Sequence, residues 1–280
     1  RQIVQAEKLG FDSAWVAQHH FSRSEGGLPA PLVFLAHVAA LTSRIRLGTG
    51  IVTLPLEQPI RVAEDAAVLD LLSSGRLELG VGSGGTPSSF IAFGHDSADR
   101  AAIFERHLAT LRTALAGSPL PGDSVLYPAS HPLTERIWQA TFSSNGSRRA
   151  GQAGDGLMLS RTQPRPAEAP RATLSDIQHP IVDAYLSSRP GELAPRIVAS
   201  RTLFVADDRA VARRHAEAGL QRAAAALKRA GHVFDGDTLD DLIRATDTHV
   251  GTVDEVIASL STDTVLPRAT DVVFQVHSVD

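Results

Sequence analysis

The chain has 280 residues, a formal net charge of −4, 43% apolar residues and no cysteine. This length fits one large α/β domain or two smaller ones, and the ordinary apolar content argues against disorder. The acidic balance disfavours a nucleic-acid partner, and no apolar run approaches the roughly 18 residues of a membrane span. The lack of cysteine excludes disulfides, thiolate metal sites and cysteine nucleophiles. Without a signal-peptide pattern at the start, we expect a cytoplasmic protein.

The first elements in chain order are a helix, a strand and a second helix. Apolar residues at helical spacing predict a helix over 1–10, with Gly10 at its end. Residues 13–17 predict a short strand. A glycine-rich loop follows, and residues 29–41 predict a helix with proline in its first turn.

The stretch from 44 to 85 predicts a βαβ unit. Residues 45–52 form a β-branched and aliphatic block, typical of a strand covered on both faces. Apolar residues over 57–74 follow helical spacing and stop before Gly75. The next strand is expected over 77–82, and it must run parallel to the first because a helix connects them.

The remaining chain continues the alternation of strands and helices. A loop is expected over 117–132, which holds four prolines and two glycines, and the polar segment 235–266 is expected to be helical. The other predicted elements are helices over 99–116, 146–154, 177–188 and 207–230, and strands over 137–142, 156–160, 197–205 and 271–276.

Seven strands alternating with helices favour a (β/α)8 barrel, with a doubly wound open sheet as the alternative. A helix stands before the first predicted strand, so we expect a TIM barrel whose first strand is missing from the chain. We expect residues 1–280 to form a single domain.

The glycines at 80–85 match the G-x-G-x-x-G pattern of a dinucleotide-binding loop. No helix is expected to open directly after them, and no lysine suits a phosphate-binding loop of the Walker type. We therefore interpret Gly80 and Gly82 as a strand end where missing side chains let a flat ligand approach the backbone. Gly82 and the adjacent Ser83 are candidates for cofactor contact. A tight strand end without a ligand is the alternative.

Several motifs together are specific for one family. They are LGFDSAWVAQHHF at 9–21, SRIRLGTG at 43–50, VAED at 62–65, SGRL at 74–77, LGVG at 79–82, GDGL at 154–157 and HVGTVDEV at 249–256. In this order they resemble the bacterial luciferase-like flavin-dependent monooxygenases. The resemblance implies a (β/α)8 barrel of luciferase-like type, with FMN at the carboxyl ends of the strands.

His19 and His20 directly follow the first predicted strand, at the end of a barrel where active sites lie. The resemblance implies that the pair belongs to the active site and that His19 takes part in proton transfer. Family members carry glutamate before the pair, whereas Gln18 stands here, so an adjacent carboxylate that would raise a histidine pKa is absent. The alternatives are a lining of the flavin pocket or two loop histidines bonded to backbone.

The flavin ring is expected at Thr49, Gly50 and Ile51, where the resemblance places it against the backbone. Glycine permits such a close approach. Ordinary strand packing is the alternative.

The phosphate of FMN is expected where a strand passes into the helix that begins near Gly146. Free amides and a positive dipole face outward at such a helix start, and Arg148 or Arg149 can add charge. The resemblance implies a Ser-x-x-Gly turn around the phosphate, matched by Ser143 and Gly146. Ser147 belongs to the same turn, and a helix capped without any ligand is the alternative.

Arg161 follows the next predicted strand and is a candidate for contact with phosphate or an acidic substrate, or else a surface arginine. The other histidines show no metal-ligand spacing, so we expect no metal site.

The resemblance implies an FMN-dependent monooxygenase that uses reduced flavin and O2 to oxidise a small organic substrate. Because no nicotinamide-binding motif is evident, we expect a separate reductase to supply the reduced flavin, and we expect a homodimer. Two alternatives remain: a deazaflavin-dependent dehydrogenase, which transfers hydride without oxygen, and a flavin-binding barrel without catalysis. The loops expected to set the substrate lie at 85–97 and 163–176.

Overall fold

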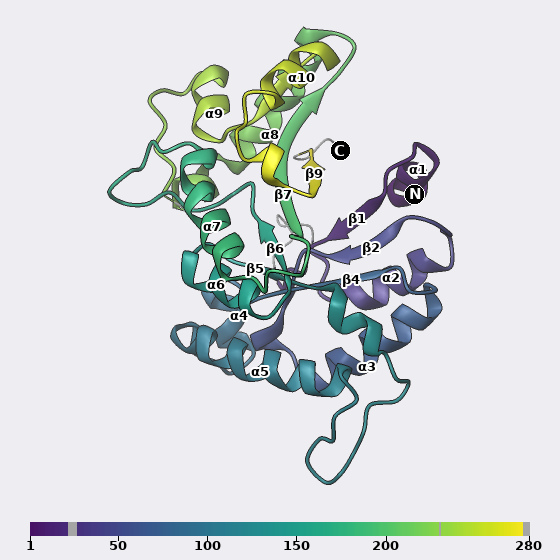
Figure 1. Ribbon diagram of the computed structural model, residues 1–280. Coiled ribbons are helices and arrows are strands. Elements are labelled where there is room, and N and C mark those ends of the chain that lie inside the picture. The colour runs from purple at the N-terminus through teal and green to yellow at the C-terminus, as the bar shows by residue number, and fades with distance from the viewer. Residues whose placement is uncertain (22–26, 230, 277–280) are drawn as a thin grey trace. The chain divides into compact units, whose positions relative to one another are not determined.

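The computed structural model describes residues 1–21, 27–229 and 231–276, which form two compact α/β units (Figure 1). Unit 1 spans Arg1–Ala140 and unit 2 spans Thr141–Asp280. Within each unit, the pairings between named strands are parallel. The expectation of one domain over 1–280 stays a prediction.

Unit 1 is a parallel sheet with strand order β1-β2-β4-β5, and β3 pairs with the last residues of β4. Its strands are β1 (Ser13–Val16), β2 (Arg46–Thr49), β3 (Val52–Thr53), β4 (Leu77–Gly82) and β5 (Ile137–Ala140). Its helices are α1 (Gln2–Lys8), α2 (Pro31–Ala39), α3 (Pro59–Leu72), α4 (Pro87–Ala92) and α5 (Arg100–Leu115).

The core of unit 1 forms where α3 and α5 bury their apolar sides against the strands. Ala63 and Leu69 of α3, Leu108 and Leu111 of α5, and Leu79 of β4 all belong to this one cluster. Strands of parallel sheets are buried on both faces, which accounts for the continuous apolar runs in the sequence.

A buried polar layer crosses the four strands of unit 1. The Glu78 carboxylate of β4, 7% exposed, accepts hydrogen bonds from Trp138 Nε1 of β5 at 2.6 Å and from Arg46 Nε of β2. Trp15 of β1 meets the Trp138 ring edge to face at 5.6 Å. A Cβ at Gly48 would lie 2.2 Å from Trp15, so β2 carries glycine where the indole crosses it. Adjacent strands are therefore fixed in register by side chains as well as by backbone.

Unit 2 is organised on the long strand β7. The strand β6 pairs with its first residues, whereas β9 and β8 pair with successive stretches, 198–202 and 203–205. The strands are β6 (Gly156–Leu159), β7 (Ile197–Val205), β8 (His249–Gly251) and β9 (Asp271–Gln275). The helices are α6 (Ser144–Gln152), α7 (Leu174–Ser188), α8 (Arg209–Arg229), α9 (Leu239–Ala245) and α10 (Val253–Leu260).

Most elements lie within a few residues of their predicted positions, and three expectations need correction. The block 45–52 is two strands, because pairing stops after Thr49 and resumes at Val52. The segment 235–266 contains β8 between its helices, and its alternation of buried and half-buried residues is too short to stand out in sequence. A helix, α4, begins at Pro87, so the statement that no helix opens after the glycines was wrong.

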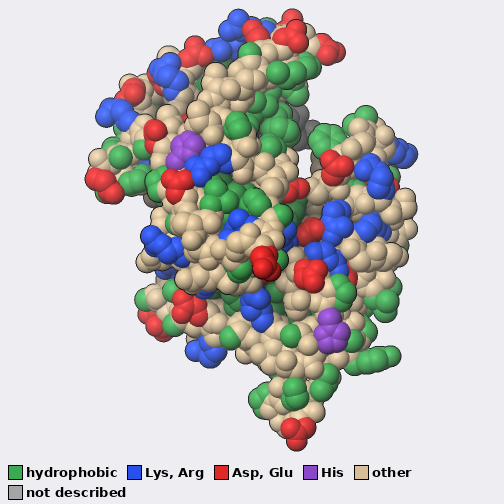
Figure 2. Space-filling view, in the orientation of Figure 1, with side chains coloured by type: hydrophobic (Ala, Val, Ile, Leu, Met, Phe, Trp, Pro, Cys, Tyr) green, Lys and Arg blue, Asp and Glu red, His purple; other side chains and the backbone are tan. Residues whose placement is uncertain are grey.

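The surface carries mixed charge. Figure 2 shows basic and acidic side chains interspersed over the visible face, in keeping with the formal charge of −4. Among the residues described, no helix has the length and apolar character needed to cross a membrane.

We predict that Asp70→Ala lowers the free energy of unfolding by about 3–5 kcal/mol, because it removes the buried carboxylate that pairs with the partly buried Arg136. Asp70 accepts two hydrogen bonds from Arg136, at 2.7 and 2.8 Å, and raises the pKa of that guanidinium. The measurement is urea denaturation. The control is Asp65→Ala on the same helix, whose exposed pair with Arg61 contributes less than about 1 kcal/mol. Equal losses in the two variants would contradict the prediction.

Candidate functional site

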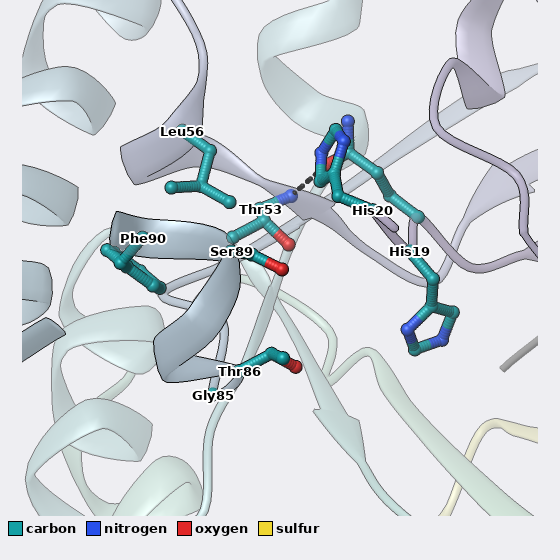
Figure 3. Close-up of a pocket in the computed structure, with 9 residues that line it drawn as sticks. His19, His20, Thr53, Leu56, Gly85, Thr86, Ser89 and Phe90 are labelled. Atoms are coloured by element: carbon teal, nitrogen blue, oxygen red, sulfur yellow. Dashed lines mark hydrogen bonds between the residues drawn. The ribbon is translucent and has the colours of Figure 1, made fainter. Parts of the chain in front are cut away.

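An open hollow lies at the carboxyl ends of the strands of unit 1, with about 260 Å³ of free space, part of it open to solvent (Figure 3). It is lined by Gln18, His19, His20, Thr53, Leu56, Gly85, Thr86, Ser89 and Phe90. Residues from the ends of β1, β3 and β4 meet here because parallel strands all end at the same edge of the sheet. The predicted histidine pair therefore lies in the hollow.

The two histidines occupy different surroundings. Figure 3 shows the His20 ring beside Thr53 and the His19 ring turned to another side. The His20 ring packs edge-on against Phe93 at 4.8 Å, and its buried Nε2 has no hydrogen-bond partner among the described residues. Burial lowers the pKa of His20, the charge of Glu57 opposes this shift, and His19 adds to it. The backbone amide of His19 donates to the Leu28 carbonyl at 3.0 Å.

Gln18, which precedes the pair, is buried and fully engaged. Its Oε1 accepts from the Thr53 amide at 2.7 Å, and its Nε2 donates to Glu57 Oε1 at 2.6 Å and to the Pro29 carbonyl at 2.9 Å. These bonds join the loop after β1 to the segment after β3. No carboxylate precedes the histidine pair in the sequence, but the structure places the Glu57 carboxylate, from another loop, beside Gln18.

The predicted ring-binding residues lie at the ends of β2 and β4. The buried Thr49 hydroxyl donates to the Gly80 carbonyl at 2.7 Å and so links two neighbouring strands. A Cβ at Gly82 would lie 3.0 Å from Ile51 Cδ1. The Gly50–Ile51 peptide bond is cis. Ring contact by Thr49, Gly50, Ile51, Gly82 and Ser83 stays a prediction.

In unit 2, the predicted phosphate turn opens α6. The Ser143 side chain caps the helix by accepting from the Gly146 amide at 3.2 Å. A Cβ at Gly146 would lie 2.2 Å from Thr141 Oγ1 and 2.8 Å from its Cβ, so only glycine fits this turn. The first amides of a helix have no carbonyl one turn back, and they point outward from its start.

The remaining predicted residues of this turn differ in exposure. Arg148 is exposed and donates to Asn145 Oδ1 at 2.9 Å, and Arg149 is half-buried. The Ser147 hydroxyl is buried and donates to the Ile181 carbonyl of α7. Ser147 therefore joins two helices through its hydroxyl. Phosphate contact by Ser143, Ser147, Arg148 and Arg149 stays a prediction.

Arg161 lies in a second, smaller hollow of unit 2. Its Nε donates to Gln275 Oε1 at 2.7 Å and its guanidinium to Thr202 Oγ1 at 3.3 Å. His232 and Thr248 also line this hollow. Burial lowers the pKa of Arg161 to about 10, so the side chain stays charged at neutral pH. An anionic group is the chemistry that suits such a cation.

Glu57 and Thr53 are site residues that the sequence did not single out. A signal existed for both, because they stand close to the end of a predicted strand, where barrel loops carry function. Ser89 and Phe90 fall within the stretch 85–97 expected to set the substrate, but they belong to the helix α4 and not to a loop. Among the residues described, no group of three histidine or acidic side chains has the arrangement of a metal site.

Parallel α/β units with a polar hollow at the carboxyl ends of their strands are typical of barrel enzymes. The sequence profile of the luciferase-like monooxygenases matches residues 1–264. The chain belongs to the luciferase-like monooxygenase family. The predicted family is confirmed.

Individual relatives agree with this assignment. The 4-hydroxyprotoasukamycin monooxygenase of Streptomyces nodosus subsp. asukaensis is 34% identical over 215 residues, which cover 72% of this chain and 57% of that protein. The chain spans about half the length of the curated relatives it matches. The crystal structure of monooxygenase RslO1 from Streptomyces bottropensis has a TM-score of 0.79 and 27% identity, covering 100% of this chain and 85% of RslO1.

Two more distant structures share the fold. One is the oxygenating constituent of 3,6-diketocamphane monooxygenase from Pseudomonas putida in complex with FMN (TM-score 0.74, 18% identity, 100% of this chain and 85% of the other). The second is an F420-dependent secondary alcohol dehydrogenase with an F420–acetone adduct (TM-score 0.72, 16% identity, 100% and 88%). The α/β barrel class of luciferase-like type, expected from the sequence, is confirmed by these likenesses.

We predict that Gly146→Ala destabilises the protein by about 1–3 kcal/mol, because its methyl group overlaps Thr141. Alanine in a helix is otherwise favoured over glycine by about 0.5–1 kcal/mol, so a loss marks the overlap. Thermal unfolding is the measurement. Gly191→Ala, where no atom lies within 4 Å of an added Cβ, is the control. If Gly146→Ala is as stable as the control, the turn can accommodate the methyl group and the prediction is wrong.

Proposed function

We propose that the protein is an FMN-dependent monooxygenase that uses reduced flavin and O2 to oxidise a small organic substrate. The observation that carries the proposal is the histidine pair in a polar hollow at the strand ends, in a chain of the luciferase-like monooxygenase family. FMN, when bound, supplies the electrons that reduce oxygen, so the protein itself needs no metal or redox side chain.

The residues present fit FMN in each unit by itself. In unit 1, His20 Nε2 is buried and unpartnered among described residues, which leaves it a polar atom to offer a ligand. In unit 2, the start of α6 combines the Ser143 cap, first-turn amides and two arginines, a donor set that matches a phosphate. For unit 2, we propose Ser143, Gly146 and Arg148 or Arg149 as contacts of a phosphate. For unit 1 taken by itself, we propose Gly50 and Ser83 as contacts of a flavin ring.

The chain's own residues would bind the cofactor and the substrate and would transfer protons during the reaction. The side chains of Phe90, Phe93 and Leu56 place apolar surface beside the histidines. His20 is neutral at pH 7, because burial lowers its pKa below the ordinary 6.5. A neutral imidazole can accept a proton at Nε2 and return it later. We propose this role for the pair, with His20 as the better placed member.

Further parts of the proposal concern partners. Reduced flavin would come from a separate reductase, and the active form would be a homodimer. The coenzyme F420 is the competing cofactor, because an F420-dependent dehydrogenase shares the fold. Hydride transfer would then replace oxygen chemistry.

Cofactor binding and oxygen dependence test the proposal. We expect the purified protein to bind FMN in a fluorescence titration, and to change the rate at which reduced FMN is reoxidised by O2 compared with free reduced FMN. With the protein, FMN and NADH alone, we expect no reduction of FMN until a flavin reductase is added. Binding of F420 in place of FMN would overturn the assignment. FMN binding with an unchanged reoxidation rate would indicate a flavin-binding barrel without oxygen chemistry.

We predict that Ser143→Ala weakens FMN binding by about threefold to tenfold, the loss expected for one hydrogen bond of about 1 kcal/mol. Riboflavin lacks the phosphate, so its affinity should not change. The ratio of the two dissociation constants is the measurement, and it separates lost phosphate contact from general damage. Ser261→Ala, an exposed serine bonded within α10, is the matched control. If wild-type protein binds riboflavin as tightly as FMN, the phosphate is not held.

A further inference from the structure

The amide of Gln18 has one orientation that satisfies its surroundings. The Thr53 amide can only donate, so it must face the side-chain oxygen, at 2.7 Å. The Glu57 carboxylate, as an anion, and the Pro29 carbonyl can only accept, so they must face the nitrogen, at 2.6 and 2.9 Å. Gln18 is 6% exposed, which makes each of these bonds costly to lose.

This arrangement is incompatible with a carboxylate at position 18. A glutamate there would place its oxygen within about 3 Å of both the Glu57 anion and the Pro29 carbonyl, and two like charges at that distance cannot both be ionised in a buried site. Glutamine at 18 and glutamate at 57 are therefore a matched pair. The protein therefore keeps one carboxylate near the histidines. This carboxylate comes from the segment after β3, and position 18 in the loop after β1 carries none.

The hydrogen bond from Gln18 holds the Glu57 carboxylate 2.6 Å from the side chain that directly precedes the histidine pair. The charge of Glu57 raises the pKa of His20, against burial and against the neighbouring His19. On its other sides the His20 ring meets Phe93, which follows α4, and the adjacent Phe21, and neither carries a charge.

We propose that Glu57, anchored by the Gln18 amide, is the positioning carboxylate of the histidine pair, in place of a carboxylate at position 18. It acts through His20 and is a positioning residue. The role in turnover rests on the proposed monooxygenase function, whereas the effect on His20 does not.

The first test is a proton NMR titration of the histidines in the intact protein, with the His20 resonance assigned by its loss in His20→Gln. We expect Glu57→Gln to lower the pKa of His20 further, because the opposing charge is removed while the hydrogen bond to Gln18 is kept. Glu64→Gln on α3, which removes an exposed carboxylate paired with Arg61, is the matched control and should leave the titration unchanged. An unchanged His20 titration in Glu57→Gln would overturn the proposal.

The second test exchanges the two side chains. Gln18→Glu should lower the melting temperature, and Gln18→Glu with Glu57→Gln should recover more than half of that loss. The recovery stays incomplete because the Pro29 carbonyl loses its donor. If the double variant is no more stable than Gln18→Glu, the matched pair is wrong. Should Gln18→Glu fail to fold, a folded double variant would still support the pairing, and an unfolded one would count against it.

The third test measures the rate of turnover. Glu57→Gln should lower kcat by about tenfold or more and change KM little, since the carboxylate acts on proton transfer. It should also move the acid limb of the rate profile to lower pH, in the direction of the His20 pKa. If the wild-type protein shows no oxidation with FMN and O2 but the His20 titration shifts as expected, the proposed function fails and this inference stands.

Discussion

The strand ends of unit 1 have fixed places because one buried carboxylate links neighbouring strands. Glu78 accepts from the Trp138 indole and from the Arg46 guanidinium, and Trp138 in turn supports Trp15. A buried carboxylate without these donors would cost several kcal/mol, so only the register that brings all of them together is stable. Gly48 contributes by leaving room for the Trp15 ring. Since side chains alternate between faces, a slip of one residue would invert the whole layer.

That register determines where the functional loops begin. With β1, β2 and β4 held side by side, the residues that follow them emerge at one edge of the sheet. The hollow of unit 1 is lined by residues from those loops and from α4. The side-chain amide of Gln18 then connects the loop after β1 to the segment after β3, and this connection helps to define the surroundings of the histidine pair. The strands determine where the loop with the histidine pair begins, and a few buried hydrogen bonds determine how its side chains are oriented.

The sequence predicts the alternation of strands and helices well, because apolar runs and helical periodicity depend only on local residues and on burial. Its failures have physical causes. The break between Thr49 and Val52 falls at Gly50, and a glycine there is compatible with a continuous strand as well as with an interruption, so the local sequence does not decide between them. β8 is three residues long and owes its existence to pairing with β7, a contact distant in sequence. α4 begins with proline and serines, residues that locally favour a turn as much as a helix.

The candidate site is predictable only where neighbours in the chain are also neighbours in space. The histidine pair and the turn before α6 fall into that class, since each is one continuous stretch that the fold simply exposes. Glu57 falls outside it, because 39 residues separate it from Gln18 and only the parallel pairing of strands brings the two side chains together. A motif comparison scores position 18 as a lost carboxylate. What an imidazole responds to, however, is a negative charge within a few ångströms, whichever loop provides it. Loops that leave one sheet edge can exchange that charge between them, so a departure from a motif at one strand end is a reason to inspect the others.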